Sequence, residues 1–290
     1  MPHDQPVIPV TTSDDHQFEL IHIRADQARS AMLFLPGMGM TGRQYIGFAQ
    51  ALAREGIEVF IHEWRGLGSS SLRAGRDSDW GYRELLEFDL RAVLDRALEV
   101  AKAGRIILAG HSLGSQFACM LAGLQPDRTA GIVLIAGGAP RWKSFPLWMG
   151  LPLYLGFHAM PTIARLTGHY PGRQLGFAGR EARRVMADWA RTGRSGRYTV
   201  PDSAHDLEAT MARLEVPILA LRMEADWFVP PASLQWLLDK MPHSDATTEL
   251  ITSKCMQIKA DHYRWMQSPE ATVRAISRWQ NPTTSEHRSQ

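Results

Sequence analysis

Short apolar runs alternate with longer amphipathic segments along most of the chain. The short runs have the length and the aliphatic content of buried strands, and we expect strands at 18–23, 31–35, 58–62, 105–109, 131–136, 217–222 and 248–251. Apolar residues recur at helical spacing in the longer segments 44–55, 82–103, 116–123, 232–241 and 269–279. This alternation predicts an α/β fold with a mostly parallel, doubly wound sheet.

One region interrupts the alternation. Between Ala139 and Val200 there is no clear strand, but there are many glycines, prolines, arginines and large apolar residues. We therefore expect a core formed by residues 1–139 and 201–290, with an inserted, mainly helical cap over residues 140–200. The apolar residues of the cap must cover something, either the edge of the sheet or a ligand. Its arginines either form a solvated face or receive a carboxylate or phosphate group of the substrate.

Composition narrows the range of partners. The chain has 290 residues, 44% of them hydrophobic, and a net charge of +2, so nothing suggests binding to nucleic acid or to an anionic membrane. Cys119 and Cys255 are expected to be free thiols, because two cysteines in a chain of this kind are typical of a reducing compartment. The first residues lack a secretory pattern, and the apolar stretch 146–161 is too interrupted to span a bilayer. We expect a cytoplasmic protein whose polar tail, 281–290, frays.

The strongest chemical signal follows the expected strand at 105–109. The pentapeptide Gly110-His111-Ser112-Leu113-Gly114 has the pattern G-x-S-x-G and lies between a strand and a helix. A serine at such a turn has a strained backbone, and the two glycines let the turn close without Cβ clashes. Its hydroxyl is then exposed above the sheet. The backbone N–H of Leu113, at the start of the helix, can stabilise a developing oxyanion.

These residues resemble the α/β-hydrolase superfamily, and the resemblance extends over nearly the whole chain. Residues 35–39 (L-P-G-M-G) occupy the place of the loop that completes the oxyanion hole in the family, and by position the donating N–H belongs to Met38. Pro36 replaces the histidine that is usual in this loop. Residues 63–70 (E-W-R-G-L-G-S-S) are similar to the family's D-x-R-G-x-G-x-S loop, with Glu63 in place of aspartate, and we interpret them as scaffold.

The resemblance also implies the two partners of the serine, because the family order is serine, acid, histidine. After the strand expected at 217–222, the family spacing D-x-x-V-P selects Asp226, and Glu224 is the alternative. His262 lies between the last strand and the last helix, where the family has its catalytic histidine. Asp261 precedes it in place of the usual glycine and could shift the pKa of the imidazole.

The inferred reaction is acyl transfer, with Ser112 as nucleophile, His262 as base and Asp226 as the orienting acid. We predict cleavage of an ester or thioester of an apolar acyl group, with no cofactor and no metal, because the histidines lack ligand spacing. The residues expected to form the substrate pocket are large and apolar: Met40, Trp148, Trp227 and Phe228. Two alternatives use the same residues: transfer of the acyl group to an acceptor other than water, and cofactor-free oxygenation or C–C bond hydrolysis.

Overall fold

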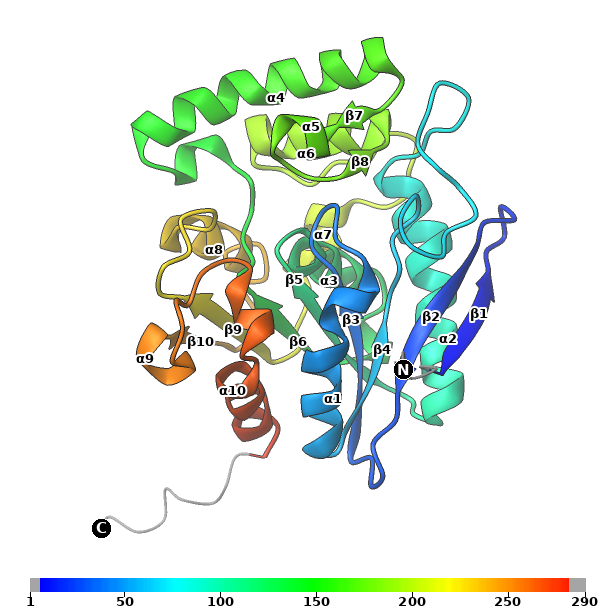
Figure 1. Cartoon of the computed structure of the whole chain (residues 1–290), viewed down its shortest axis with the longest axis vertical. Coiled ribbons are helices and arrows are strands. Elements are labelled where there is room, and N and C mark those ends of the chain that lie inside the picture. The colour runs from blue at the N-terminus through cyan, green and yellow to red at the C-terminus, as the bar shows by residue number, and fades with distance from the viewer. Residues whose placement is uncertain (1–5, 282–290) are drawn as a thin grey trace.

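The computed structural model describes residues 6–281, and its centre is an eight-stranded sheet. The strand order is β1-β2-β4-β3-β5-β6-β9-β10. The bounds are Val7–Thr11 (β1), Gln17–Ile23 (β2), Ser30–Leu35 (β3), Ile57–Ile61 (β4), Ile106–His111 (β5), Thr129–Ile135 (β6), Ile218–Met223 (β9) and Ala246–Ile251 (β10). From β4 to β10 all neighbouring strands are parallel, so their carboxyl ends meet at one edge of the sheet (Figure 1). The predicted α/β class with a mostly parallel sheet is confirmed.

Strand β1 was not expected from the sequence. It pairs antiparallel with β2 at the edge of the sheet, and its residues alternate between exposed and buried. Pro9 lies in the middle of this strand, and a proline inside a short apolar run weakens the strand signal. An edge position tolerates the missing N–H, which explains how the strand forms despite Pro9.

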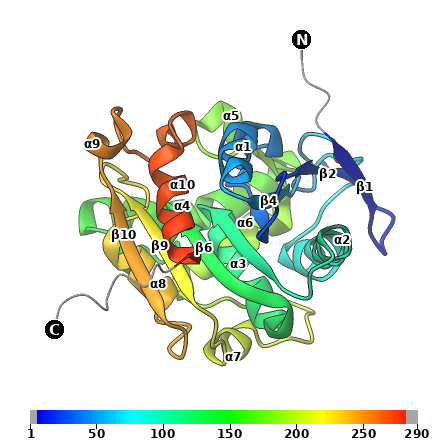
Figure 2. The ribbon, with the colours of Figure 1, turned by 90° about the horizontal axis from the view of Figure 1, so that it is seen from below.

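Helices cover both faces of the sheet, as Figure 2 shows from below. Helices α1 (Ile46–Arg54) and α10 (Glu270–Gln280) pack on one face. The other face carries α2 (Arg91–Ala101), α3 (Leu113–Leu124), α7 (Leu207–Ala212) and α8 (Pro231–Leu238). A π-helical stretch, Glu84–Leu90, leads into α2, within the region where the sequence predicted one continuous helix. The central strands are buried on both faces, as expected for parallel strands between two helical layers.

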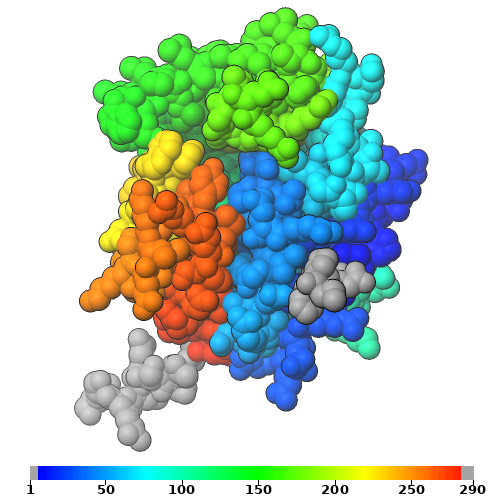
Figure 3. Space-filling model, in the orientation of Figure 1, coloured from blue at the N-terminus to red at the C-terminus, as the bar shows by residue number. Residues whose placement is uncertain are grey.

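The connection between β6 and β9, apart from α7, forms a separate layer above the carboxyl ends of the strands (Figures 1 and 3). It contains α4 (Leu147–Thr167), α5 (Gly172–Leu175), α6 (Arg183–Ser195) and the small strands β7 (Tyr170–Pro171) and β8 (Arg180–Glu181). Helix α4 crosses the top of the molecule, with α5, α6 and the two strands beneath it (Figure 1). A short helix, α9 (Ser253–Met256), follows β10.

Several smaller expectations concern single segments. Cys119 is buried, Cys255 is exposed, and both are free thiols. In the described part of the chain no helix has the length and apolarity needed to cross a bilayer. The predicted fraying tail, apart from Asn281, lies outside the described residues.

Candidate active site

Ser112 lies in a sharp turn between the end of β5 and the start of α3. Its backbone has φ +53° and ψ −115°, a conformation that residues with a side chain rarely adopt. The backbone N–H of Ser112 donates to Ile135 O at 3.1 Å, which fixes the turn to β6. Such strain persists only where the surrounding structure enforces it, and it is typical of functional sites.

The two glycines of the pentapeptide are required by packing. A Cβ at Gly110 would lie 2.1 Å from the carbonyl carbon of Gly114. A Cβ at Gly114 would lie 2.0 Å from Leu35 O, so α3 starts in direct contact with the end of β3. Because the obstacles are backbone atoms, no rotamer change could relieve either clash. The elbow therefore closes only with glycine at both positions.

The side chains of Ser112, His262 and Asp226 form one continuous hydrogen-bonded chain. Ser112 Oγ lies 3.0 Å from His262 Nε2, and His262 Nδ1 lies 2.8 Å from Asp226 Oδ2. The side chains of His262 and Asp226 are only 5% and 2% exposed. In this arrangement the carboxylate accepts from Nδ1–H, which leaves Nε2 free to accept the serine proton.

The structure distinguishes between the two candidate acids. Asp226 Oδ1 accepts hydrogen bonds from the backbone N–H groups of Phe228 and Val229, at 2.8 and 3.2 Å, so its other oxygen is held toward the imidazole. Glu224 is exposed, and its carboxylate accepts from Ser253 N at 2.9 Å. The Glu224 carboxylate is therefore bonded to the backbone that follows β10, whereas His262 Nδ1 is paired with Asp226.

The loop that carries Met38 is held by two aromatic side chains. Trp64 Nε1 donates to Pro36 O at 3.0 Å, and Gly37 N donates to Tyr45 Oη at 3.0 Å. These bonds explain how the loop is fixed although Pro36 replaces the usual histidine. Met38 and Leu113, the two residues expected to donate to an oxyanion, both border the cavity above Ser112.

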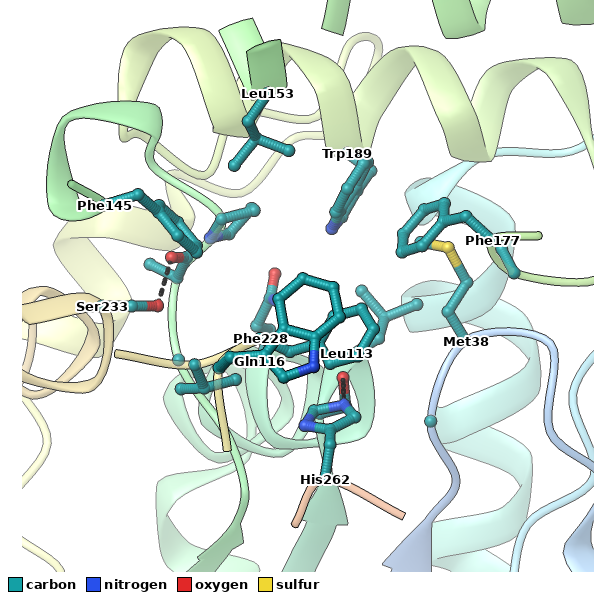
Figure 4. Close-up of a pocket in the computed structure, with 18 of the residues that line it drawn as sticks. Met38, Leu113, Gln116, Phe145, Leu153, Phe177, Trp189, Phe228, Ser233 and His262 are labelled. Carbon is teal, nitrogen blue, oxygen red and sulfur yellow. Dashed lines mark hydrogen bonds between the residues drawn. The ribbon is translucent and has the colours of Figure 1, made fainter. Parts of the chain in front are cut away.

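A cavity of about 370 Å³ opens above the Ser112 hydroxyl. We call its lower wall the floor, formed mainly by Met38, Leu113, Gln116, Phe228 and His262, and its upper wall the roof, formed by Phe145, Leu153, Phe177 and Trp189 (Figure 4). Ser112, which precedes Leu113, belongs to the floor, and Met149 of α4 belongs to the roof. The floor comes from the sheet and its helices, and the roof comes from the β6–β9 connection. No Lys, Arg, Asp or Glu lines this cavity among the described residues.

Three of the four residues expected to form the substrate pocket, Met40, Trp227 and Phe228, border this cavity. The expectation for Trp148 was wrong, because its side chain is 74% exposed on the outer side of α4 and does not line the cavity. Its neighbour Met149 points inward instead. Helix α4 is apolar on nearly all sides, so the sequence did not show which of its faces is turned toward the core.

The fold matches that of known proteins. The family model described as "Serine aminopeptidase, S33" matches residues 26–255. The chain belongs to this family of α/β hydrolases. None of the curated proteins matches the chain.

Solved structures similar to this hydrolase include esterases and lipases. A thermophilic esterase from Thermogutta terrifontis is 17% identical, with a TM-score of 0.65, and the match covers 96% of this chain and 98% of that one. A monoacylglycerol lipase from Paleococcus ferrophilus is 19% identical, with a TM-score of 0.60, over 90% and 98% of the two chains. The thioesterase domain from the curacin biosynthetic pathway is 14% identical, with a TM-score of 0.61, over 94% and 99%. At such identities the likeness shows the fold.

Sequence reasoning missed a buried network beneath Ser112 of this hydrolase. His111 Nε2 donates to the backbone oxygen of His262 at 2.9 Å, and His111 Nδ1 therefore accepts from Tyr45 Oη at 2.7 Å. Burial lowers the pKa of His111 well below its ordinary value and raises the pKa of Tyr45, so both stay neutral. Because Tyr45 also accepts from Gly37, the network links the backbone of His262 to the loop of Met38. Only the histidine inside G-x-S-x-G could have signalled it.

The same loop touches the β6–β9 connection of the hydrolase. Gly39 has φ +73°, and a Cβ there would lie 2.4 Å from Gly179 N. A Cβ at Gly179 would in turn lie 2.9 Å from Gly39 Cα. The loop that carries Met38 and the turn before β8 are therefore in backbone contact.

Charged residues near the site hold backbone segments in place. Asp261 Oδ1 accepts from the N–H groups of Tyr263 and Arg264, at 3.1 and 2.9 Å, and so orders the turn that follows His262. Several arginines of the β6–β9 connection form bonds with carboxylates or carbonyls outside the cavity, as in Arg191 with Asp188, Arg180 with Ala74 O and Arg194 with Phe157 O.

Proposed function

We propose that this α/β hydrolase cleaves an ester or thioester of an apolar acyl group through an acyl-enzyme on Ser112. The observation that carries the proposal is the chain of hydrogen bonds from Ser112 through His262 to Asp226, which ends at an apolar cavity. A serine hydroxyl is a weak nucleophile by itself and needs an oriented base of this kind.

In the proposed reaction His262 Nε2 takes the proton of Ser112 as Oγ attacks the carbonyl carbon of the substrate. The N–H groups of Met38 and Leu113 stabilise the oxyanion of the tetrahedral intermediate. The protonated His262 then gives its proton to the leaving alcohol or thiol as the bond to the carbonyl carbon breaks. Water, deprotonated by the same imidazole, attacks the acyl-enzyme and releases the acid and the free serine.

The cavity favours an apolar acyl group. Its walls are mostly Met, Phe, Trp, Leu, Pro and Ala side chains, and no formally charged side chain of the described residues faces it. We propose that the β6–β9 connection is the cap of the enzyme, corresponding to residues 140–200. In that role the cap supplies the wall against which the acyl chain packs and keeps water from most of the site.

Replacement of the nucleophile tests the reaction. Ser112→Ala should abolish labelling by a fluorophosphonate and lower ester turnover at least about 10⁴-fold. Ser115→Ala is the matched control, because the Ser115 hydroxyl donates to Gly110 O at 2.6 Å, and this variant should still be labelled. Undiminished turnover by Ser112→Ala would remove the assignment of the nucleophile.

A chain-length series tests the acyl preference. With p-nitrophenyl esters, kcat/KM should rise from acetate to longer chains, because each added methylene buries more apolar surface in the cavity. An acetate ester that exceeds all longer esters would contradict an apolar acyl pocket and leave the nucleophile assignment intact.

A further inference from the structure

Two buried side chains of the cavity, Gln116 and Trp189, carry a polar atom that has no hydrogen-bond partner among the described residues. Gln116 is 4% exposed and lines the cavity, and its Oε1 is buried without a partner among residues 6–281. Trp189 is 8% exposed and also lines the cavity. Trp64 and Trp236 donate their indole N–H to backbone carbonyls, whereas no residue of the described chain accepts from Trp189 Nε1.

The other buried polar groups that border this cavity are paired. Ser233 Oγ donates to Ala139 O at 2.7 Å, both nitrogens of His111 are bonded, and His262 is held by its two partners. Buried polar atoms without partners are uncommon and costly in folded proteins. The buried Gln116 Oε1 therefore stands out in this wall, and Trp189 adds an indole N–H that has no acceptor among the described residues.

The two side chains face the same space from opposite sides. Figure 4 shows Gln116 rising from α3 below and Trp189 reaching down from α6 above, with its indole nitrogen toward the cavity. The Trp189 ring is fixed by Phe157 and Phe177, whose ring centres lie 5.0 and 5.3 Å from its own. Its N–H direction is thus set before a ligand binds, and the Gln116 amide is held on a buried helix.

We propose, on the basis of the proposed function, that Gln116 and Trp189 form a subsite for a hydroxyl group on the acyl chain of the substrate. A hydroxyl both accepts and donates a hydrogen bond, so one oxygen can accept from Trp189 Nε1–H and donate to Gln116 Oε1. A plain aliphatic chain would exclude water from these atoms and leave them unpaired. A site built to bind a hydroxyl discriminates strongly against the analogue that lacks it.

The position of Gln116 indicates where the hydroxyl lies. Gln116 follows Ser112 by four residues on α3, which corresponds to about one helical turn, or ~6 Å along the axis. The hydroxyl is therefore carried several bonds away from the carbonyl carbon that Ser112 attacks. The substrate class is a medium-chain hydroxyacyl ester or thioester.

The test compares ethyl octanoate with its 3-hydroxy, 6-hydroxy and 8-hydroxy derivatives, by titration of the released acid. For wild type, kcat/KM for at least one hydroxy ester should exceed that for ethyl octanoate by about tenfold or more. Gln116→Leu keeps a similar volume and removes both polar atoms, and Trp189→Phe keeps an aromatic ring and removes the N–H. Each variant should lower kcat/KM for the preferred hydroxy ester about 10- to 100-fold more than it changes kcat/KM for ethyl octanoate.

Met149→Leu, which alters the roof without removing a hydrogen-bonding N–H or O–H, is the control and should change all four esters in similar proportion. Wild type that prefers ethyl octanoate to every hydroxy ester, or a Gln116→Leu variant that lowers all four esters equally, would overturn the subsite but not the hydrolase. Absence of turnover for all four esters, together with absence of fluorophosphonate labelling, would overturn the proposed function and the subsite with it.

Discussion

The floor of the cavity is held by hydrogen bonds, whereas its roof is held mainly by contacts between apolar side chains. In the floor, each ring nitrogen of His262 and each oxygen of Asp226 has a partner within 3.2 Å. In the roof, Trp189 packs between two phenylalanine rings, and α6 approaches α4 so closely that a Cβ at Gly193 would lie 2.2 Å from the Phe157 ring. Hydrogen bonds fix directions and apolar contacts fix volumes. The floor is therefore suited to orienting reacting groups, and the roof is suited to selecting the acyl chain of the substrate.

The largest effect expected from the floor, apart from loss of the nucleophile, comes from the acid. Asp226→Asn keeps an oxygen for the N–H groups of Phe228 and Val229 but turns an amide toward His262, which favours the wrong imidazole tautomer. We expect kcat to fall about 10³- to 10⁴-fold. Glu224→Gln is the control and should change kcat by less than about threefold, as is usual for a surface substitution. A larger loss in Glu224→Gln than in Asp226→Asn would reverse the assignment of the acid.

The contact between floor and roof should give an intermediate effect. Gly39→Ala adds a methyl group that collides with Gly179 N, so the loop of Met38 must shift, and kcat/KM should fall about 10- to 100-fold. Gly176→Ala introduces a similar backbone strain, at φ +75°, but no atom lies within 4 Å of the added Cβ. Steady-state kinetics of both variants separate collision from strain. Equal losses in the two would show that the contact is unimportant.

A smaller effect is expected within the roof. Leu153 lines the cavity, whereas Leu151 is 53% exposed on the same helix. Leu153→Ala should lower the ratio of kcat/KM for long-chain to kcat/KM for short-chain p-nitrophenyl esters about tenfold, because it removes apolar contact from one part of the cavity. Leu151→Ala should leave the ratio unchanged. A change of the ratio by Leu151→Ala alone would mean that α4 presents a different face to the substrate.

The smallest effect on activity is expected at Glu63, whose role is structural. Its carboxylate is 3% exposed and accepts from Gly42 N at 3.1 Å, and burial raises its pKa from 4.5 to about 7. Between these values the folded state binds a proton that the unfolded state has lost, so this group makes the protein less stable as pH rises from 4.5 to 7. The loss is at most about 3 kcal/mol.

Glu63→Gln keeps an acceptor and removes the titration. The Tm of the variant minus the Tm of wild type should therefore be larger at pH 8 than at pH 5, as measured by thermal unfolding. The same difference at both pH values would show that Glu63 does not bind its proton on folding.

The two regions also differ in how far the sequence revealed them. The parallel strands of the core were predicted from apolar runs, because a strand buried on both faces needs an uninterrupted run. Ser112, Asp226 and His262 were selected by their resemblance to the order and spacing of the family's catalytic residues. Their meeting is consistent with the fold class, because the carboxyl ends of parallel strands lie at one edge of the sheet. The bond between Tyr45 and His111 joins segments 66 residues apart, and its only sequence signal is the histidine inside G-x-S-x-G.

The roof was less predictable for a physical reason. Helix α4 has apolar residues on the inside and on the outside, as Met149 and the exposed Trp148 show. Periodicity distinguishes a buried face only where the opposite face is polar. Gln116 and Trp189 were missed because an unpaired polar atom is a property of the packed structure, and neither residue belongs to a motif.

The close approach of Gly114 to Leu35 O means that the G-x-S-x-G turn depends on a second segment of the chain. The pentapeptide closes only against the end of a neighbouring strand whose own loop carries Met38. A designer who transfers G-x-S-x-G to another parallel sheet must transfer the pentapeptide together with the strand end that it contacts. The height of the hydroxyl above the sheet is a joint property of two chain segments separated by more than seventy positions.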